Sequence, residues 1–191
     1  MRRRDLLGLG LCYPAFVFSQ VRYPKVTPNN SLQFPRDHGA HPDYRQEWWY
    51  LTGWLKTARG EDLGFQVTFF RTKLDVENSN PSTFTPRQVI LAHAAFADPK
   101  HGRLRHDERA ARTALDLAGS REGNTEVWVD DWKLALNKDA YQARIRARDF
   151  SLDLDFTPST IVLQGDSGFS RKGDGPEEAS YYYSRPHLKV S

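Results

Sequence analysis

The stretches EWWYLTGWL (residues 47–55) and LGFQVTFFR (residues 63–71) decide the fold. Both are rich in aromatic and β-branched residues, which favour strands. In the second stretch Phe65, Val67 and Phe69 occupy alternate positions, the spacing of side chains on one face of a strand. The loop at residues 56–62 contains Gly60 and joins them. The two stretches therefore predict an antiparallel hairpin.

Further strand-like segments continue on the carboxyl side of this hairpin. They lie at residues 88–96, 126–136, 141–147 and 150–156, with shorter ones at 161–164, 180–184 and 187–190. Residues 103–119 are the one helical candidate, because Leu104, Ala111, Leu115 and Ala118 recur at three- to seven-residue steps before Gly119. This pattern predicts an all-β, antiparallel barrel or sandwich of about eight to ten strands.

The amino terminus has the features of an export signal. Residues 2–4 are all Arg, residues 6–18 are mostly apolar, and Ser19 predicts cleavage before Gln20. The run at residues 3–7, RRDLL, also resembles a twin-arginine signal. The apolar stretch is too short to span a bilayer. We therefore expect a signal at residues 1–19, an extended leader at 20–33, a domain at 34–191 and a periplasmic or extracellular location.

Charge and cysteine content exclude two classes of protein. Removal of residues 1–19 takes away three Arg and one Asp, so the formal charge falls from +3 to +1. A nearly neutral domain with interspersed charges is not expected to bind nucleic acid. Cys12 leaves with the signal, so the mature chain has no disulfide.

Three charged or titratable residues lie within otherwise apolar strands and are candidates for a site. They are Glu47, Arg71 and His93. A buried charge is costly unless it is paired, so Glu47 and Arg71 are expected to form an ion pair, with His93 beside it if all three point inward. This group could orient a ligand or hold the sheet in register.

The aromatic cluster at residues 48–54 supplies a further candidate. Trp48 and Tyr50 share one face of a strand, and Trp49 shares the other face with Leu51. One face belongs to the core, and the other could line a cavity or stack on a sugar. We include Trp49 with Glu47, Arg71 and His93 as the ligand-binding candidates.

Two other kinds of site can be drawn from the sequence. The tetrapeptide at residues 165–168, GDSG, is typical of the nucleophile loop of chymotrypsin-like proteases, but Phe169 replaces a needed glycine and His93 lies too near in sequence. Asp37, His38, His41 and Asp43 are possible metal ligands in a turn-rich loop, where solvated histidines are more common. Turn chemistry accounts for the first segment, and no metal site is predicted from the second.

Several long motifs, in order, resemble a known family. They are FPRDHGAHP (34–42), RQEWWYLTG (45–53), GFQVTFFR (64–71), HAA (93–95), LQGD (163–166), KG (172–173) and SYYYSRP (180–186). The sequence is similar over roughly residues 31–191 to the family that joins bacterial AttH-type attachment proteins to hydroxyneurosporene synthase, the carotenoid 1,2-hydratase.

The resemblance implies a lipocalin-like fold and a hydrophobic ligand such as a polyene or a lipid. Family members contain two lipocalin-like domains, and this chain resembles the first. The hydratase adds water to a terminal double bond without a cofactor, and its catalytic residues belong to the second domain, so none is carried over and the single domain is expected to be inactive. The alternative is a non-catalytic protein that binds a hydrophobic ligand or a glycan, with possible association with the cell envelope.

Overall fold

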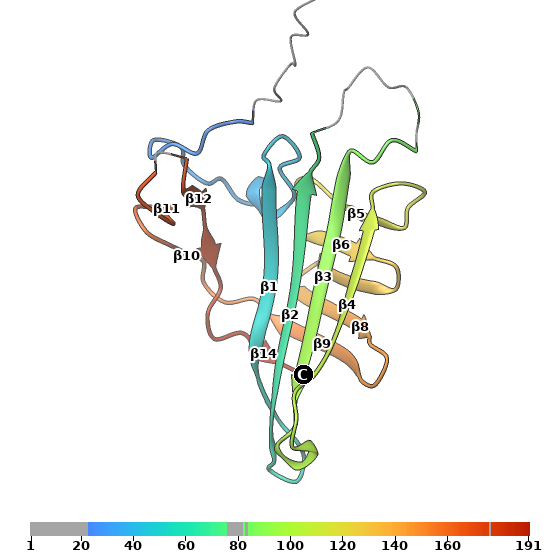
Figure 1. Ribbon diagram of the computed structural model, residues 1–191. Helices are drawn as coiled ribbons and strands as arrows, with labels where there is room; N and C mark the ends of the chain where they lie inside the picture. Colours follow the sequence, from blue (N-terminus) through green and yellow to red (C-terminus); the bar gives the residue numbers. More distant parts are fainter. Residues whose placement is uncertain (1–22, 76–81, 83, 176) are drawn as a thin grey trace, which may run out of the picture.

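The computed structural model describes residues 23–75, 82, 84–175 and 177–191 (Figure 1). The predicted export signal at residues 1–19 lies outside this part, as does the start of the predicted leader. Within the described residues, no helix is both long and apolar enough to cross a membrane.

The predicted hairpin forms one edge of a four-stranded antiparallel sheet, which we call the front sheet (Figure 1). Its strands, in spatial order, are β1 (Gln46–Lys56), β2 (Asp62–Lys73), β3 (Gln88–Ala97) and β4 (Arg105–Arg112). In the pairing register Leu51 lies opposite Val67, and Val67 lies opposite Ala94. This alignment places the odd-numbered residues of β1 and β2 on one face of the sheet.

A second antiparallel sheet, the back sheet, packs behind the first (Figure 1). Its strands are β14 (Lys189–Val190), β9 (Ser151–Thr157), β8 (Ala140–Arg146), β7 (Trp132–Asn137), β6 (Glu126–Val129) and β5 (Ala118–Ser120), in this spatial order. The segment 126–136, predicted as one strand, is the β6–β7 hairpin. It turns at Asp130, whose φ of 51° is left-handed.

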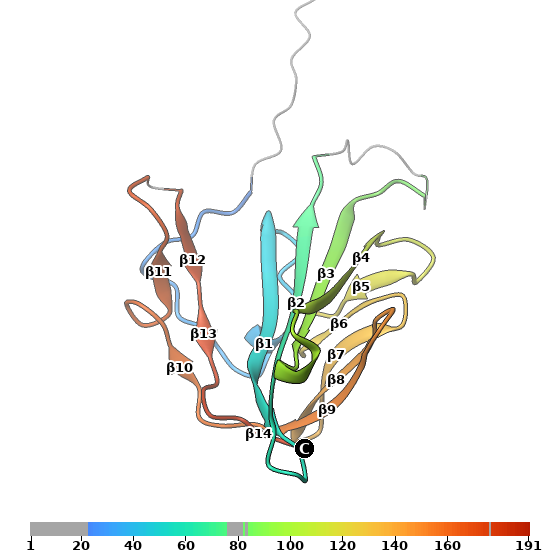
Figure 2. The ribbon, with the colours of Figure 1, turned by 60° about the horizontal axis from the view of Figure 1, so that its bottom comes forward.

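Between β9 and β14 the chain makes an excursion, residues 158–188, which we call the C-terminal arm. Its four short strands pair locally: β10 (Val162–Leu163) with β13 (Tyr183–Ser184), and β11 (Phe169–Arg171) with β12 (Ala179–Tyr181). Both ribbon views place the arm beside β1, at the free edge of the front sheet (Figure 2). The arm thereby brings carboxyl-terminal side chains to the beginning of the domain.

The prediction of a helix over residues 103–119 is wrong. The segment forms β4, a turn and β5, and the apolar spacing that suggested a helix arises from two different strands. Asp107 is buried while Glu108 is exposed, as the two-residue period of a strand requires. Leu115 and Asp116 in the turn have φ values of 55° and 59°, which no right-handed helix contains. The described helical turns are two 3₁₀ segments, η1 (Arg36–His38) and η2 (Pro99–His101).

The inner faces of the two sheets enclose one hydrophobic core. Its fully buried side chains include Val67, Phe69, Ile90, Val127, Val129, Trp132 and Ile145. The indole N–H of Trp132 donates to the carbonyl of Arg146 at 2.8 Å, so its polar atom is also satisfied. The all-β, antiparallel prediction is confirmed. In the described residues the sheets form a filled sandwich and not a closed barrel.

Candidate functional site

Glu47 and Arg71 form the expected buried ion pair on the inner face of the front sheet. Arg71 Nε donates to Glu47 Oε2 at 2.7 Å, and the Arg71 side chain is fully buried. Its other nitrogens donate to the backbone carbonyls of Pro42, His41 and Tyr44 at 3.5, 2.9 and 2.9 Å. The guanidinium therefore ties the loop before β1 to the sheet, and its donors are directed at protein acceptors.

His41 and Asp37 extend this ion pair into the amino-terminal loop. His41 Nδ1 lies 2.7 Å from Glu47 Oε1, and His41 Nε2 lies 3.2 Å from Asp37 Oδ1. The hydrogen bond to Glu47 raises the pKa of His41 against the opposing effect of burial, and Asp37 adds to the rise. Burial raises the pKa of Asp37, but hydrogen bonds from Arg36, the Gln33 backbone and His41 outweigh it and lower that pKa to about 2.

The four possible metal ligands of this loop are engaged with protein groups. His38 lies against the hydroxyl of Tyr183, with Nδ1 at 3.1 Å, and Asp43 lies 3.4 Å from Lys73 Nζ. Asp37 and His41 belong to the network with Glu47. Among the described residues, no group of three or more His, Cys, Asp or Glu side chains is arranged to hold a metal ion.

The structure separates the remaining two candidates. Trp49 points inward and packs against the core. His93 points outward from β3, with its side chain about half exposed and its Nε2 3.7 Å from Glu108 Oε2. His93 is therefore not beside the Glu47–Arg71 pair, because the register places Ile90 opposite Arg71 and Thr68 opposite His93.

The outer face of the front sheet carries an apolar row that crosses all its strands. Register places Trp48 opposite Phe70, Phe70 opposite Leu91, and Leu91 opposite Ala110. Each of these four side chains retains some exposure. Because adjacent strands lie about 4.8 Å apart, four strands give a row about 14 Å long. We call these four residues the apolar row.

A polar row runs directly beside it, two residues along each strand. It consists of Tyr50, Thr68, His93 and Glu108. The rings of Phe70 and His93 lie 5.9 Å apart, which joins the two rows. Beyond the polar row lies a hollow of about 320 Å³ over β2, β3 and β4, lined in part by Gln66, His93 and His106.

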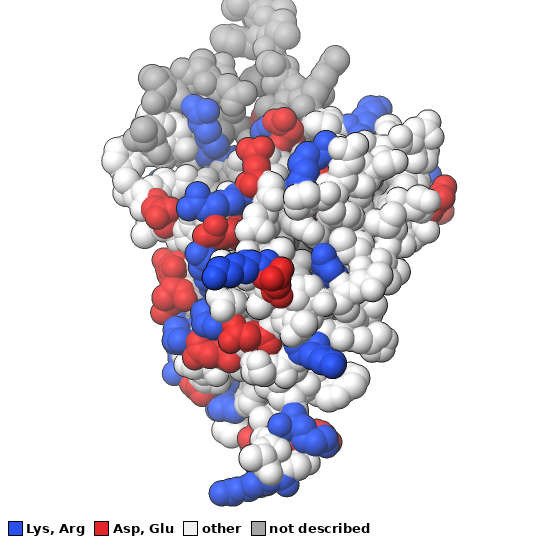
Figure 3. Space-filling model, turned by 180° about the vertical axis from the view of Figure 1, so that it is seen from behind, with Lys and Arg blue, Asp and Glu red and all other residues white. Residues whose placement is uncertain are grey.

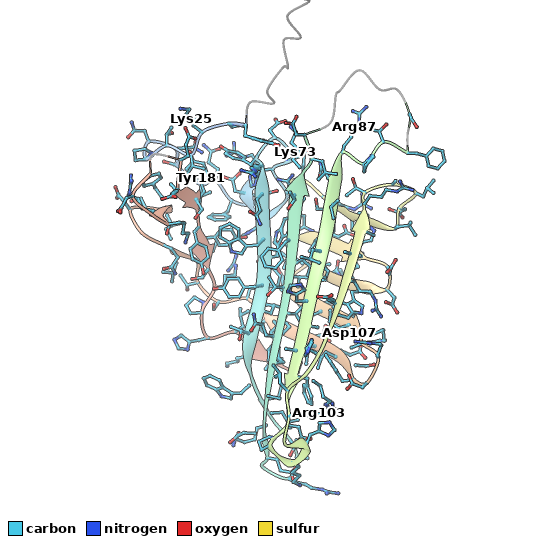
Figure 4. All side chains as sticks on the ribbon, in the orientation of Figure 1. Lys25, Lys73, Arg87, Arg103, Asp107 and Tyr181 are labelled. Atoms are coloured by element: carbon cyan, nitrogen blue, oxygen red, sulfur yellow. The ribbon has the colours of Figure 1, made fainter. Side chains whose placement is uncertain are left out.

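Tyr182, on the C-terminal arm, lies at the β1 end of the apolar and polar rows. Its ring lies 6.2 Å from that of Trp48, and its hydroxyl is 2.5 Å from that of Tyr50. Burial raises the pKa of Tyr182 to about 12, and the hydrogen bond to Tyr50 acts in the same direction. Tyr181 on the arm and Asp107 on β4 mark the two sides of the face in Figure 4.

The outer face of the back sheet has a different character. Figure 3 shows positive and negative side chains interleaved across it. Cross-strand ion pairs join Lys133 to Glu126 and Arg146 to Asp153, at 2.6 and 2.8 Å. Exposed ion pairs of this kind are readily solvated by water. The partly exposed aromatic side chains of the front face mark it as the better binding surface.

The sequence pattern anticipated part of this face. Alternation along β1 correctly placed Trp48 and Tyr50 opposite to Trp49 and Leu51, and Leu51 is 8% exposed whereas Tyr50 is 41% exposed. The same two-residue period identifies Phe70 and Leu91 once the register is known. The sequence pattern does not indicate that Tyr182 lies on the outer face of the front sheet, because the fold of the C-terminal arm brings it there.

Comparisons with known proteins agree with this architecture. The profile described as AttH-like matches residues 25–191. The chain is similar to a crystal structure of a Nitrosomonas europaea protein assigned as an AttH, with 50% sequence identity and a TM-score of 0.77. That similarity covers 87% of this chain and 50% of the other, so this chain spans half of that protein's length. No curated protein matches the chain.

Proposed function

Because this chain belongs to the AttH-like family, we propose that it binds an extended hydrophobic small molecule, a polyene or a lipid, on the outer face of the front sheet. The apolar row is the observation that carries this proposal. It is continuous across the sheet, partly exposed and bordered by aromatic Tyr182. The interior is a less suitable place, because fully buried side chains such as Trp132 and Phe69 occupy it.

The polar row gives such a ligand an orientation. Hydroxyl groups of Tyr50 and Tyr182 lie at the β1 side, and the His93–Glu108 pair lies toward β4. A few polar groups beside a largely apolar surface are typical of small-molecule sites. A molecule with an apolar chain and one polar group would match both rows.

The test is a titration of the protein with all-trans-retinol, monitored by quenching of tryptophan fluorescence. Leu91→Asp places a charge in the apolar row and should weaken binding by at least about tenfold, because the ligand would desolvate that charge. Leu117→Asp is the matched control, since Leu117 is 48% exposed and lies outside the row. Unchanged binding in Leu91→Asp, with a native circular dichroism spectrum, would refute this site.

A second candidate, which departs from the expectation of an inactive single domain, is cofactor-free hydration of a carotenoid-type polyene. The observation that favours it is the placement of His93 and Glu108 beside the apolar row. Hydration of an alkene needs an acid that protonates carbon and a base that accepts a proton from water, and His and Glu can serve in these roles. Incubation with an acyclic carotene followed by analysis for the tertiary alcohol tests it. Product that persists in His93→Gln would exclude His93 from the reaction.

We also propose that the chain is exported, on the basis of the signal-like residues 1–19. The consecutive basic residues followed by a short apolar run support this location. Cell fractionation of a tagged chain should recover it outside the cytoplasm. Replacement of Arg3 and Arg4 by Lys should retain it inside if the twin-arginine route is used.

A further inference from the structure

One end of the front sheet carries a second exposed apolar feature, which begins at Trp54, four residues beyond Tyr50 of the polar row along β1. The β1–β2 hairpin and the β3–β4 connection project together from this end of the molecule (Figure 1). Asp98 accepts a hydrogen bond from the Lys100 backbone at 2.9 Å, and the Lys100 side chain forms an ion pair with Glu61 of the hairpin. The two loops therefore form one unit, which we call the tip (residues 54–64 and 97–104).

The tip exposes large apolar side chains. Trp54 is 77% exposed and Leu104 is 59% exposed. They border a hollow of about 470 Å³ that Leu63 and Pro99 also line. An indole held this far out of the core has an apolar body and a polar N–H, a combination that favours the interface between water and lipid.

The tip carries four basic side chains, Lys56, Arg59, Lys100 and Arg103, and three acidic ones, Glu61, Asp62 and Asp98. Lys56 is paired with Asp62 at 2.7 Å, and Lys100 is paired with Glu61. Among the described residues, no carboxylate lies within ion-pair distance of Arg59 or Arg103; Arg103 Nε donates to the His101 ring at 3.4 Å, so neither guanidinium charge is neutralised by a carboxylate. Figure 4 shows Arg103 at this end, and Figure 3 shows basic side chains at the lowest point of the molecule.

We propose that the tip docks on an anionic lipid membrane, with Trp54 and Leu104 inserted at the headgroup level and Arg59 and Arg103 near lipid phosphates. Projection from the end of the sandwich allows contact with a planar surface without burial of the front face (Figure 1). Apolar insertion and electrostatic attraction then act together, as in other peripheral membrane contacts. The charge of Arg59 and Arg103 favours this partner over a neutral glycan.

The test is co-sedimentation of the full chain with vesicles of phosphatidylcholine, with and without 30% phosphatidylglycerol. We expect stronger binding to the anionic vesicles and weaker binding in 0.5 M salt. Trp54→Ser combined with Leu104→Ser should reduce binding by about tenfold or more. Arg59→Gln and Arg103→Gln should each reduce binding to anionic vesicles about fivefold and leave neutral vesicles unaffected.

Leu115→Ser is the matched control, because Leu115 is 69% exposed but lies in the β4–β5 turn, outside the tip. This variant should bind as the parent does. An equal loss in Leu115→Ser, or recovery of the parent protein in the supernatant with both kinds of vesicle, would overturn the proposal. The tip and the apolar row share no residue, so retinol binding and vesicle binding can fail independently.

Discussion

At the scale of single residues, the feature with the largest energetic consequence is the fully buried guanidinium of Arg71. Its charge is compensated by Glu47, and its remaining donors reach three backbone carbonyls. A buried charge is tolerated when its partners are this complete. The arrangement links β2 to the loop before β1, so it holds the amino-terminal loop in place independently of any ligand.

Arg71→Met should therefore destabilise the fold by about 3–5 kcal/mol, because the largely buried Glu47 would lose its guanidinium partner and keep only His41. Lys56→Ala removes one partner of the exposed Lys56–Asp62 pair and should cost less than about 1 kcal/mol. Urea denaturation followed by tryptophan fluorescence measures both changes. A similar small effect for both substitutions would contradict a structural role for Arg71.

His41 should make stability depend on pH near neutrality. Its pKa is raised in the folded state above the ordinary value of 6.5, since Glu47 and Asp37 favour its protonated form. The resulting stabilisation is fully present below about pH 6.5 and is lost as pH rises through the folded-state pKa. The urea midpoint of the parent should decline across this range. His41→Gln should abolish that decline, and a parallel decline in both proteins would exclude His41 as its source.

At the scale of elements, two-residue alternation and close backbone approach determine how segments pack. The η1 loop reaches the back sheet at Gly39, where an added Cβ would lie 2.2 Å from the backbone nitrogen of Gly123. Thr125 supports the same contact by donating its hydroxyl to the carbonyl of His38 at 2.9 Å. The amino-terminal loop therefore contacts both sheets.

Gly39→Ala should destabilise the domain by about 3 kcal/mol or more, because backbone atoms and not a mobile side chain occupy the required space. Gly60→Ala is the matched control. Gly60 has a φ of 83° with open space around it, so the cost should be about 1 kcal/mol of backbone strain. Thermal unfolding should give a clearly lower midpoint for Gly39→Ala. Equal midpoints would show that the loop can move away from Gly123.

At the scale of the whole molecule, the two outer faces and the C-terminal arm have different roles. The back face is covered by paired charges, whereas the front face presents the apolar row. The arm is a local excursion from the back sheet that contacts the leader, where Tyr181 accepts a hydrogen bond from the Thr27 backbone at 2.9 Å. The arm thereby links the carboxyl-terminal part of the described chain to its amino-terminal leader.

Hydrogen exchange should distinguish the arm from the two sheets. Amides of β11 and β12 pair only over three residues, whereas β2 and β3 have long ladders and a fully buried inner face. We expect arm amides to exchange at least about tenfold faster than those of β2 and β3. Equal protection would indicate that the arm unfolds with the core as one cooperative unit.

The sequence by itself determined the all-β class, the β1–β2 hairpin and the opposite faces of Trp48 and Trp49, because strand alternation is a local property of the chain. It also indicated the Glu47–Arg71 pair, since two charges within apolar strands require each other. Tertiary structure alone decided that His93 faces away from this pair, that residues 103–119 form two strands and a turn, and that Tyr182 lies against Trp48. These outcomes depend on register and on contacts between segments far apart in the chain, and local spacing carries no information about either.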